Sequence, residues 1–318
     1  MKTSTPMNLI PAQVFGRGGS HAVFLAAAAM LFSGCTTPIR VPISSDSRTQ
    51  LGAVNGIVGL RQQEIGTSIN RSNVSAATGG GLIAAIVDMS VDNARAKKAE
   101  SAVTSVRDAL VNYQPGNVLA GDLQKALASV PGVNPSHVDV RQIIDPKTTG
   151  AWIQGSGGAS VLLVTLDYKL SPNFDSIIVS AEVSLHPGGD RLGKIAQTKS
   201  DLPPLVYYNV LSCTGSLPGL TGQQTPDGMA RLWAANGGQP ARMVLDAGLQ
   251  ELAAMIAYDL TAPAPPEGEA YKAPDGAEKR LATVYGTMDT TFQGYIEHKA
   301  DGWIWVRLPA GQLSAVAQ

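Results

Sequence analysis

The fold is decided by the stretch LLVTLDYKLSPNFDSIIVSAEVSL at residues 162–185. Apolar residues fill every second position in each half, and polar residues fill most of the positions between them. This period of two is typical of strands that bury one face. The segment Ser-Pro-Asn-Phe-Asp at 171–175 is rich in turn formers and predicts the reversal between the strands. Residues 162–185 therefore predict an antiparallel β-hairpin with one apolar face.

Helical patterns flank this hairpin on both sides. Apolar residues recur every three or four positions from Leu82 to Tyr113, where Pro115-Gly116 stops the pattern. A shorter helical pattern follows from Leu119 to Val130, and an amphipathic pattern spans roughly 240–260. Further strands are expected at 205–213 and 138–144. Strands in a meander with helices gathered on one face predict an α+β fold.

The C-terminal part is expected to stand apart from this body. Residues 261–280 are rich in proline and predict a stiff linker. Beyond it, residues 291–298 and 303–308 flank Asp301-Gly302, a hairpin turn signal. The sequence thus predicts an α+β domain at 51–260, a Pro-rich linker at 261–280 and a small β-hairpin unit at 281–318.

The N-terminus has the character of a targeting segment. Lys2 and Arg17 supply positive charge, and an apolar run of eleven residues occupies 22–32. A helix of that length rises about 16 Å, too short for a hydrocarbon core of roughly 30 Å. The run suits the apolar region of a secretory signal.

The run ends in Leu31-Phe32-Ser33-Gly34-Cys35, which resembles the lipobox of bacterial lipoproteins. The resemblance implies a signal peptide at 1–34, cleavage before Cys35 and attachment of palmitate-type acyl chains at Cys35. Several acyl chains would give a stable membrane anchor. Residues 35–50 would then be a lipidated tether that lifts the body off the bilayer. Thr36 in place of Asp implies the outer membrane, facing the periplasm. Cleavage by an ordinary signal peptidase is the competing interpretation.

Composition excludes several classes of function. The chain has 24 Lys and Arg against 25 Asp and Glu, which argues against a nucleic-acid binder. The usual hydrolase and phosphate-loop motifs are missing, and the histidines lack ligand spacing. We therefore expect no metal site and no cofactor. Cys213 is expected to be a small buried hydrophobe.

The terminal hairpin carries the candidate binding residues. Trp303, Trp305 and Arg307 share one strand face, and two tryptophans with an arginine are typical of a binding hot spot. They could stack a glycan ring or dock a partner protein. Alternatively, this face is the one that packs on the body.

The sequence leaves three hypotheses on function. The first is a lipid-anchored, non-enzymatic accessory, scaffold or assembly factor of the cell envelope, with an envelope protein as partner. The second is a periplasmic ligand binder or cell-wall-acting enzyme with a polar pocket. Candidate pocket residues are Asp167, Glu182, Tyr207 and Tyr208. The third is a structural subunit that uses the Trp303/Trp305 face.

Overall fold

The computed structural model describes residues 40–49, 51–69, 82–143, 146–188, 205–217, 224–263, 271–284 and 290–318. The expected signal peptide and Cys35 lie outside the described residues. All described residues belong to one compact unit. Among them, no helix is long and apolar enough to cross a membrane.

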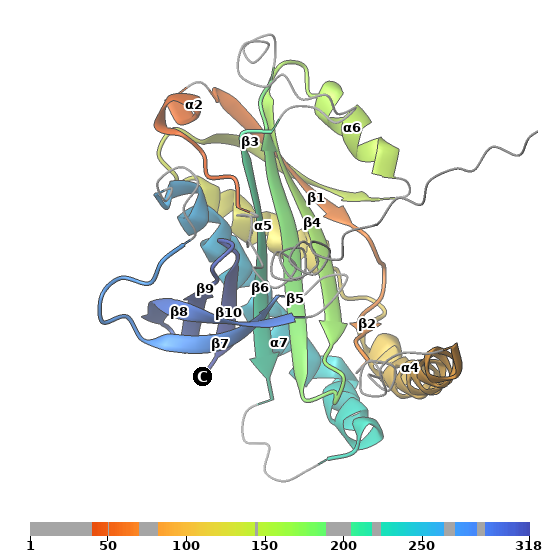
Figure 1. Ribbon diagram of the computed structural model, residues 1–318. Coiled ribbons are helices and arrows are strands. Elements are labelled where there is room, and N and C mark those ends of the chain that lie inside the picture. The colour runs from red at the N-terminus through yellow and green to blue at the C-terminus, as the bar shows by residue number, and fades with distance from the viewer. Residues whose placement is uncertain are drawn as a thin grey trace, which may run out of the picture. The chain divides into compact units, whose positions relative to one another are not determined.

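One ten-stranded sheet organises the chain (Figure 1). Its strands run in the order β3-β1-β4-β5-β6-β10-β9-β8-β7, and the short β2 pairs with β4 outside this path. The strands are β1 (Ala53–Leu60), β2 (Gly66–Thr67), β3 (Asn134–Gln142), β4 (Ser160–Leu170), β5 (Ser176–His186), β6 (Tyr207–Ser216), β7 (Lys279–Val284), β8 (Thr290–Ala300), β9 (Trp303–Arg307) and β10 (Leu313–Ala317).

The α+β class is confirmed, and the predicted hairpin at 162–185 is β4 and β5. These two strands pair antiparallel from Val161 opposite His186 to Leu170 opposite Ile177. The sheet as a whole is mixed, however, because β1 pairs parallel with both β3 and β4, and β10 pairs parallel with β6. The antiparallel meander is therefore the centre of the sheet and not all of it.

The described helices are α2 (Ser45–Thr49), α4 (Leu82–Leu110), α5 (Pro115–Leu127), α6 (Pro146–Gln154) and α7 (Pro226–Thr261). Of these, α4 and α7 are the long ones. Pro115 ends the predicted first helical pattern and at the same time occupies the first turn of α5, where a missing N–H costs nothing. α7 is two helices joined at a break, with positive φ at Asn236, Gly237 and Gly238.

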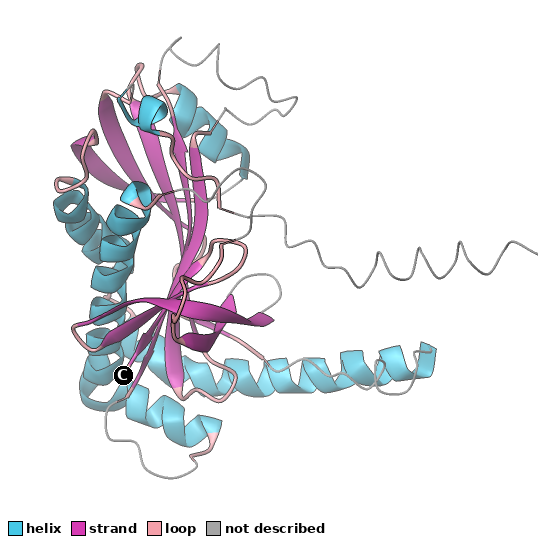
Figure 2. Cartoon of the chain, turned by 60° about the vertical axis from the view of Figure 1, so that its left-hand side comes forward, coloured by secondary structure: helices cyan, strands magenta, loops and turns pink. Residues whose placement is uncertain are grey.

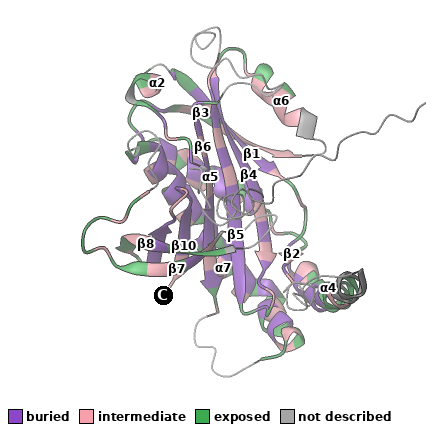
Figure 3. Ribbon diagram, viewed as in Figure 1, coloured by how far each residue is buried: buried purple, intermediate pink, exposed green. Residues whose placement is uncertain are grey.

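The main core lies between the sheet and three helices. Even-numbered residues of β4 and odd-numbered residues of β5 face it, as the period of two requires. α5, α7 and the C-terminal part of α4 cover this face, and Figure 3 shows buried residues concentrated there. The N-terminal part of α4 extends away from the sheet (Figure 2), and no residue of 89–98 is buried.

The opposite face of the sheet is covered in part by α6. Ile57 of β1 with Val161 and Leu163 of β4 form a small second cluster, on which Trp152 and Ile153 of α6 pack. The expectation of helices on one face therefore holds for α4, α5 and α7 but not for α6. The short apolar stretch of α6 carried too little periodicity to be predicted.

The segment expected to be a tether is partly built into the body. Val41 pairs with Tyr208 of β6 through both backbone groups, at 2.8 and 3.0 Å. Arg40 and Ile43 are buried. Any free tether after Cys35 therefore ends by residue 39, before the expected boundary at 50.

The C-terminal strands continue the same sheet. β9 and β8 form the expected hairpin, but β10 pairs both with β9 and with β6 of the central meander. The expected boundary at 261–280 therefore does not divide the sheet. β7 and β8 form a small separate cluster with Ile304 and Val306 of β9 and with Leu308, which follows β9.

Candidate functional sites

The predicted binding face of β9 is packed inside the fold. Trp303, Trp305 and Arg307 are 8%, 5% and 1% exposed. Trp305 donates a hydrogen bond from Nε1 to the Glu251 carboxylate on α7, and its ring meets that of Tyr258 edge-on at 5.2 Å. The sequence correctly placed the three side chains on one face. That face is turned toward α7 and is not a free binding surface.

A buried charge cluster surrounds the third of these residues. The Arg307 guanidinium donates to Oδ1 of Asp259 at 2.6 Å, to Oε2 of Glu297 at 2.7 Å and to the Gly311 carbonyl at 2.8 Å. Glu297 reaches it because the pairing of β8 with β9 skips this residue in a bulge between Ile296 and His298. Bulges of this kind re-aim a side chain.

Asp259, on the last turn of α7, is the centre of the cluster. Its Oδ2 accepts hydrogen bonds from Arg40 Nε at 2.9 Å, from the Tyr207 hydroxyl at 2.7 Å and from the Asn209 amide at 2.8 Å. With Arg307 on Oδ1, four donors satisfy a carboxylate that has no exposed surface. A buried charge is tolerated only when it is paired in this way.

Arg40 also ends the α7 helix. It donates to the carbonyl oxygens of Asp259 at 2.7 Å, Ala262 at 3.0 Å and Pro263 at 3.2 Å. Arg48 of α2 adds a bond of 2.9 Å to the Leu260 carbonyl. The last carbonyls of a helix lack intrahelical partners, and cations are favoured there by the helix dipole. The N-terminal segment therefore acts as the C-terminal cap of α7.

The electrostatics of the cluster favour the ionised carboxylate. Burial alone would raise the pKa of Asp259, but the charges of Arg307 and Arg40 outweigh it and hold that pKa below its usual value. Burial, followed by the charge of Asp259, raises the pKa of Tyr207 well above its usual value. Tyr207 therefore stays a neutral donor.

The role of this cluster is to stabilise the fold. Tyr271 lies against both guanidinium groups at 5.5 Å and accepts a hydrogen bond from Arg40. Only one nitrogen of the cluster, Nη2 of Arg307, has no partner among the described residues. The other charged groups are paired, and only Glu297 is partly exposed, so the cluster joins the N-terminal segment, α7 and the C-terminal strands.

An apolar cavity of about 530 Å³ opens beside Trp303. It lies between α7 and the ends of β6, β9 and β10, with Met243 and Val244 on the helix side. Among the residues that the structure describes, Asp301 is the only charged one that lines it. Trp303, one of the predicted binding residues, thus borders this cavity.

A more polar cavity of about 330 Å³ lies between α6 and the edge of the sheet. Three alternate residues of β3, namely His137, Asp139 and Arg141, project into it beside Asn55 of β1. Nη2 of Arg141 donates to Oδ2 of Asp139 at 2.9 Å, and Nε2 of His137 lies 3.6 Å from the same oxygen. The predicted strand at 138–144 already indicated that Asp139 and Arg141 lie side by side, because residues at every second position of a strand share one face.

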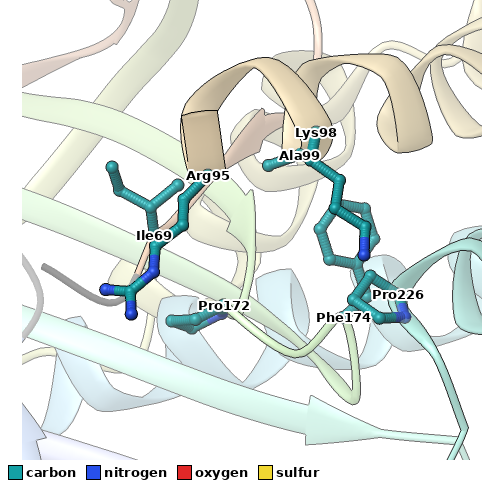
Figure 4. Close-up of a pocket in the computed structure, with 7 residues that line it drawn as sticks. All are labelled: Ile69, Arg95, Lys98, Ala99, Pro172, Phe174 and Pro226. Atoms are coloured by element: carbon teal, nitrogen blue, oxygen red, sulfur yellow. The ribbon is translucent and has the colours of Figure 1, made fainter. Parts of the chain in front are cut away.

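A third cavity, of about 210 Å³, lies where α4 crosses the start of α7 (Figure 4). Arg95 and Lys98 reach down from α4 toward Pro172, Phe174 and Pro226. Arg95 is 3.9 Å from Asp92, one turn earlier in the helix. This cavity is smaller than the other two and its polar groups come from α4 alone.

The candidate residues of the enzyme hypothesis do not converge. Tyr207 faces α7, whereas Asp167, Glu182 and Tyr208 lie on the opposite face of β4, β5 and β6. Glu182 pairs with Arg61 at 2.8 Å in an exposed ion pair. The four side chains therefore do not form one pocket.

The remaining chemistry-bearing residues are dispersed. Cys213 is fully buried, with its Sγ 3.4 Å from Sδ of Met255, and burial raises its pKa well above the usual value. Within the described residues, no group of three or more His, Cys, Asp or Glu side chains could hold a metal ion. No known protein family matches this sequence, and no curated protein matches it either.

Proposed function

We propose that the chain is a lipid-anchored envelope protein whose body acts as a non-enzymatic accessory or scaffold. The lipobox resemblance is the evidence for a lipid anchor at Cys35. One structural observation indicates how close to the membrane the body would lie. Arg40, five residues after Cys35, is fixed in the buried cluster on α7. A five-residue link spans at most about 18 Å, so the anchored body would lie close to the bilayer surface.

The accessory role is supported by the character of the charged groups. The most strongly buried charges, at Arg40, Asp259 and Arg307, are used to hold the fold together. The candidate acids and tyrosines of the enzyme hypothesis lie on two faces of the sheet. A body built in this way serves better as a rigid partner than as a catalyst.

The anchor is tested by labelling and fractionation. Cells that express the wild-type protein or Cys35→Ala are fed an alkyne analogue of palmitate, and their membranes are separated by sedimentation. We expect label on the wild type only, and release of the Cys35→Ala protein into the soluble fraction. A wild-type protein without label would refute the anchor.

The accessory role is tested by crosslinking in intact cells. A photoreactive residue is placed at Met89 on the part of α4 that extends from the sheet, and at the partly exposed Asp122 on α5 as a control site. One envelope protein captured from Met89 and not from Asp122 is expected for a scaffold. Capture of no protein from either site would argue against it. Trp303 and Trp305 are unsuitable probes because their replacement would disturb the core.

A second candidate function, ligand binding, is favoured by the polar cavity under α6. Binding sites characteristically combine a concave wall with a few convergent polar groups. Asn55, His137, Asp139 and Arg141 provide such a set.

A further inference from the structure

We propose that the cavity between α6 and β3 binds a neutral saccharide. This inference rests on ligand binding, the second candidate function, and is independent of the lipid anchor. Four features carry it: the register of β3, the contact between Arg141 and α6, the charge balance and the unused hydrogen-bonding groups.

The register of β3 creates the site. Val54 of β1 lies opposite Pro135, but Asn55 lies opposite His137, so Ser136 is an extra residue in the pairing. A shift of one residue moves every side chain of a strand to the other face. Without this bulge, the odd-numbered residues from His137 onward would point toward α5. Bulges of this kind are over-represented beside functional sites.

Gly59 leaves room for Ile143 at the edge of the cavity. It lies opposite Arg141, and a Cβ atom at this position would come within 2.8 Å of Cδ1 of Ile143 and 3.7 Å of the Trp152 ring. The missing side chain leaves room for Ile143. The Arg141 guanidinium lies over the Trp152 ring of α6, 5.5 Å from its centroid. The guanidinium is therefore held in place by an aromatic ring on one side and a carboxylate on the other.

The charges of the site already balance each other. Arg141 and Asp139 are joined at 2.9 Å and both are partly exposed. An anionic ligand that approaches Arg141 meets the carboxylate, and a cationic ligand that approaches Asp139 meets the guanidinium. A neutral ligand is the class that can bind without breaking this pair.

The hydrogen-bonding groups of the cavity that have no partner suit the hydroxyl groups of a ligand. Oδ1 of Asp139, Nε and Nη1 of Arg141, and the Asn55 amide have no hydrogen-bond partner in the described part of the chain. The set contains both donors and acceptors, and a hydroxyl group serves as both. Ile57, Val161 and Trp152 add an apolar wall that suits the C–H face of a sugar ring.

The size of the cavity limits the ligand. Its volume of about 330 Å³ is at the lower end of the range for ligand pockets, roughly 300–1,000 Å³. It therefore suits one end of an oligosaccharide chain.

The proposal is tested by calorimetry on the purified Cys35→Ala protein, with tetra-N-acetylchitotetraose and cellotetraose as probes. At least one should bind at millimolar concentration or below. Arg141→Met should weaken binding by about tenfold or more, since it removes donors while keeping the stem over Trp152. Arg61→Met is the matched control, because Arg61 pairs with Glu182 outside the cavity, and it should leave binding unchanged.

Three results would overturn the proposal. The first is no binding of either oligosaccharide, and the second is equal binding by Arg141→Met and Arg61→Met. The third is tighter binding of a charged monosaccharide, glucosamine or glucuronate, than of neutral glucose. If Arg141→Met does not fold, Asn55→Ala provides the same comparison. Because the protein tested carries no anchor, failure here leaves the labelling and fractionation result unaffected.

Discussion

Arg40 donates from Nε to Oδ2 of Asp259 at 2.9 Å, although 219 residues separate the two in the sequence. Neither side chain has any exposed surface. The pair joins the first described residue of the chain to the last turn of α7. Removal of one partner of such a pair is costly, because the other charge stays buried without compensation.

We therefore expect Arg40→Met to lower the free energy of unfolding by about 3–5 kcal/mol. The change also removes three hydrogen bonds to the end of α7. Urea denaturation at neutral pH measures the effect. Arg61→Met, in an exposed pair, is the matched control and should cost less than about 1 kcal/mol. Equal losses in the two variants would contradict a structural role for Arg40.

The cluster also predicts how stability depends on acid. The pKa of Asp259 is lower in the folded protein than its ordinary value near 3.9, so the folded state favours the carboxylate. Its contribution is present above that ordinary value and is lost as the pH falls through the folded pKa. The free energy of unfolding should therefore fall below about pH 4. Asp259→Asn should be less stable at neutral pH, and its free energy of unfolding should fall less steeply below about pH 4 than that of the wild type. An equally steep fall in both proteins would refute this.

Two glycines should respond to alanine in opposite directions. A Cβ atom at Gly294 of β8 would collide with the backbone carbonyl of Arg307, so Gly294→Ala should destabilise the protein by about 1–3 kcal/mol. A Cβ atom at Gly121 of α5 meets nothing within 4 Å. Gly121→Ala should stabilise by about 1 kcal/mol, because alanine is the better helix former. Thermal melts of both variants test the pair, and a shift of the same sign in both would be the contrary result.

Cys213 should be unreactive in the folded protein. Its thiol is buried and its pKa is raised, whereas the thiolate is the reactive form. In a Cys35→Ala background, Ellman's reagent should label about one thiol per chain in urea and almost none under native conditions. Glutathione serves as the free-thiol control. Rapid labelling without denaturant would show that this part of β6 opens to solvent.

The sequence predicted those elements whose period was unambiguous. β4 and β5 are buried on both faces over part of their length, but apolar and polar residues alternate at 164–170 and 179–185, so the period of two was clear. β1 was missed because Gly56 and Gly59 interrupt its apolar pattern and because Ile57 is buried on the α6 side. A strand covered on both sides lacks the alternation that identifies a strand from sequence.

The candidate sites were harder to predict for two physical reasons. Trp303 and Ile304 are both buried, since β9 is apolar on both faces, so the pattern could not tell which face meets α7. Arg40 and Asp259 look like ordinary surface charges in sequence, because their partners come from distant elements. The register bulge at Ser136 is likewise set by pairing with another strand.

The charge cluster has a consequence for the order of events during synthesis. A chain that emerges from its N-terminus exposes Arg40 first, while Asp259, Arg307 and the Gly311 carbonyl follow much later. Contacts between such distant segments form slowly, because a long loop must close before they add any stability. A chain cut short before residue 311 would hold buried charges whose partners never arrive. The cluster can therefore form only after synthesis has passed residue 311.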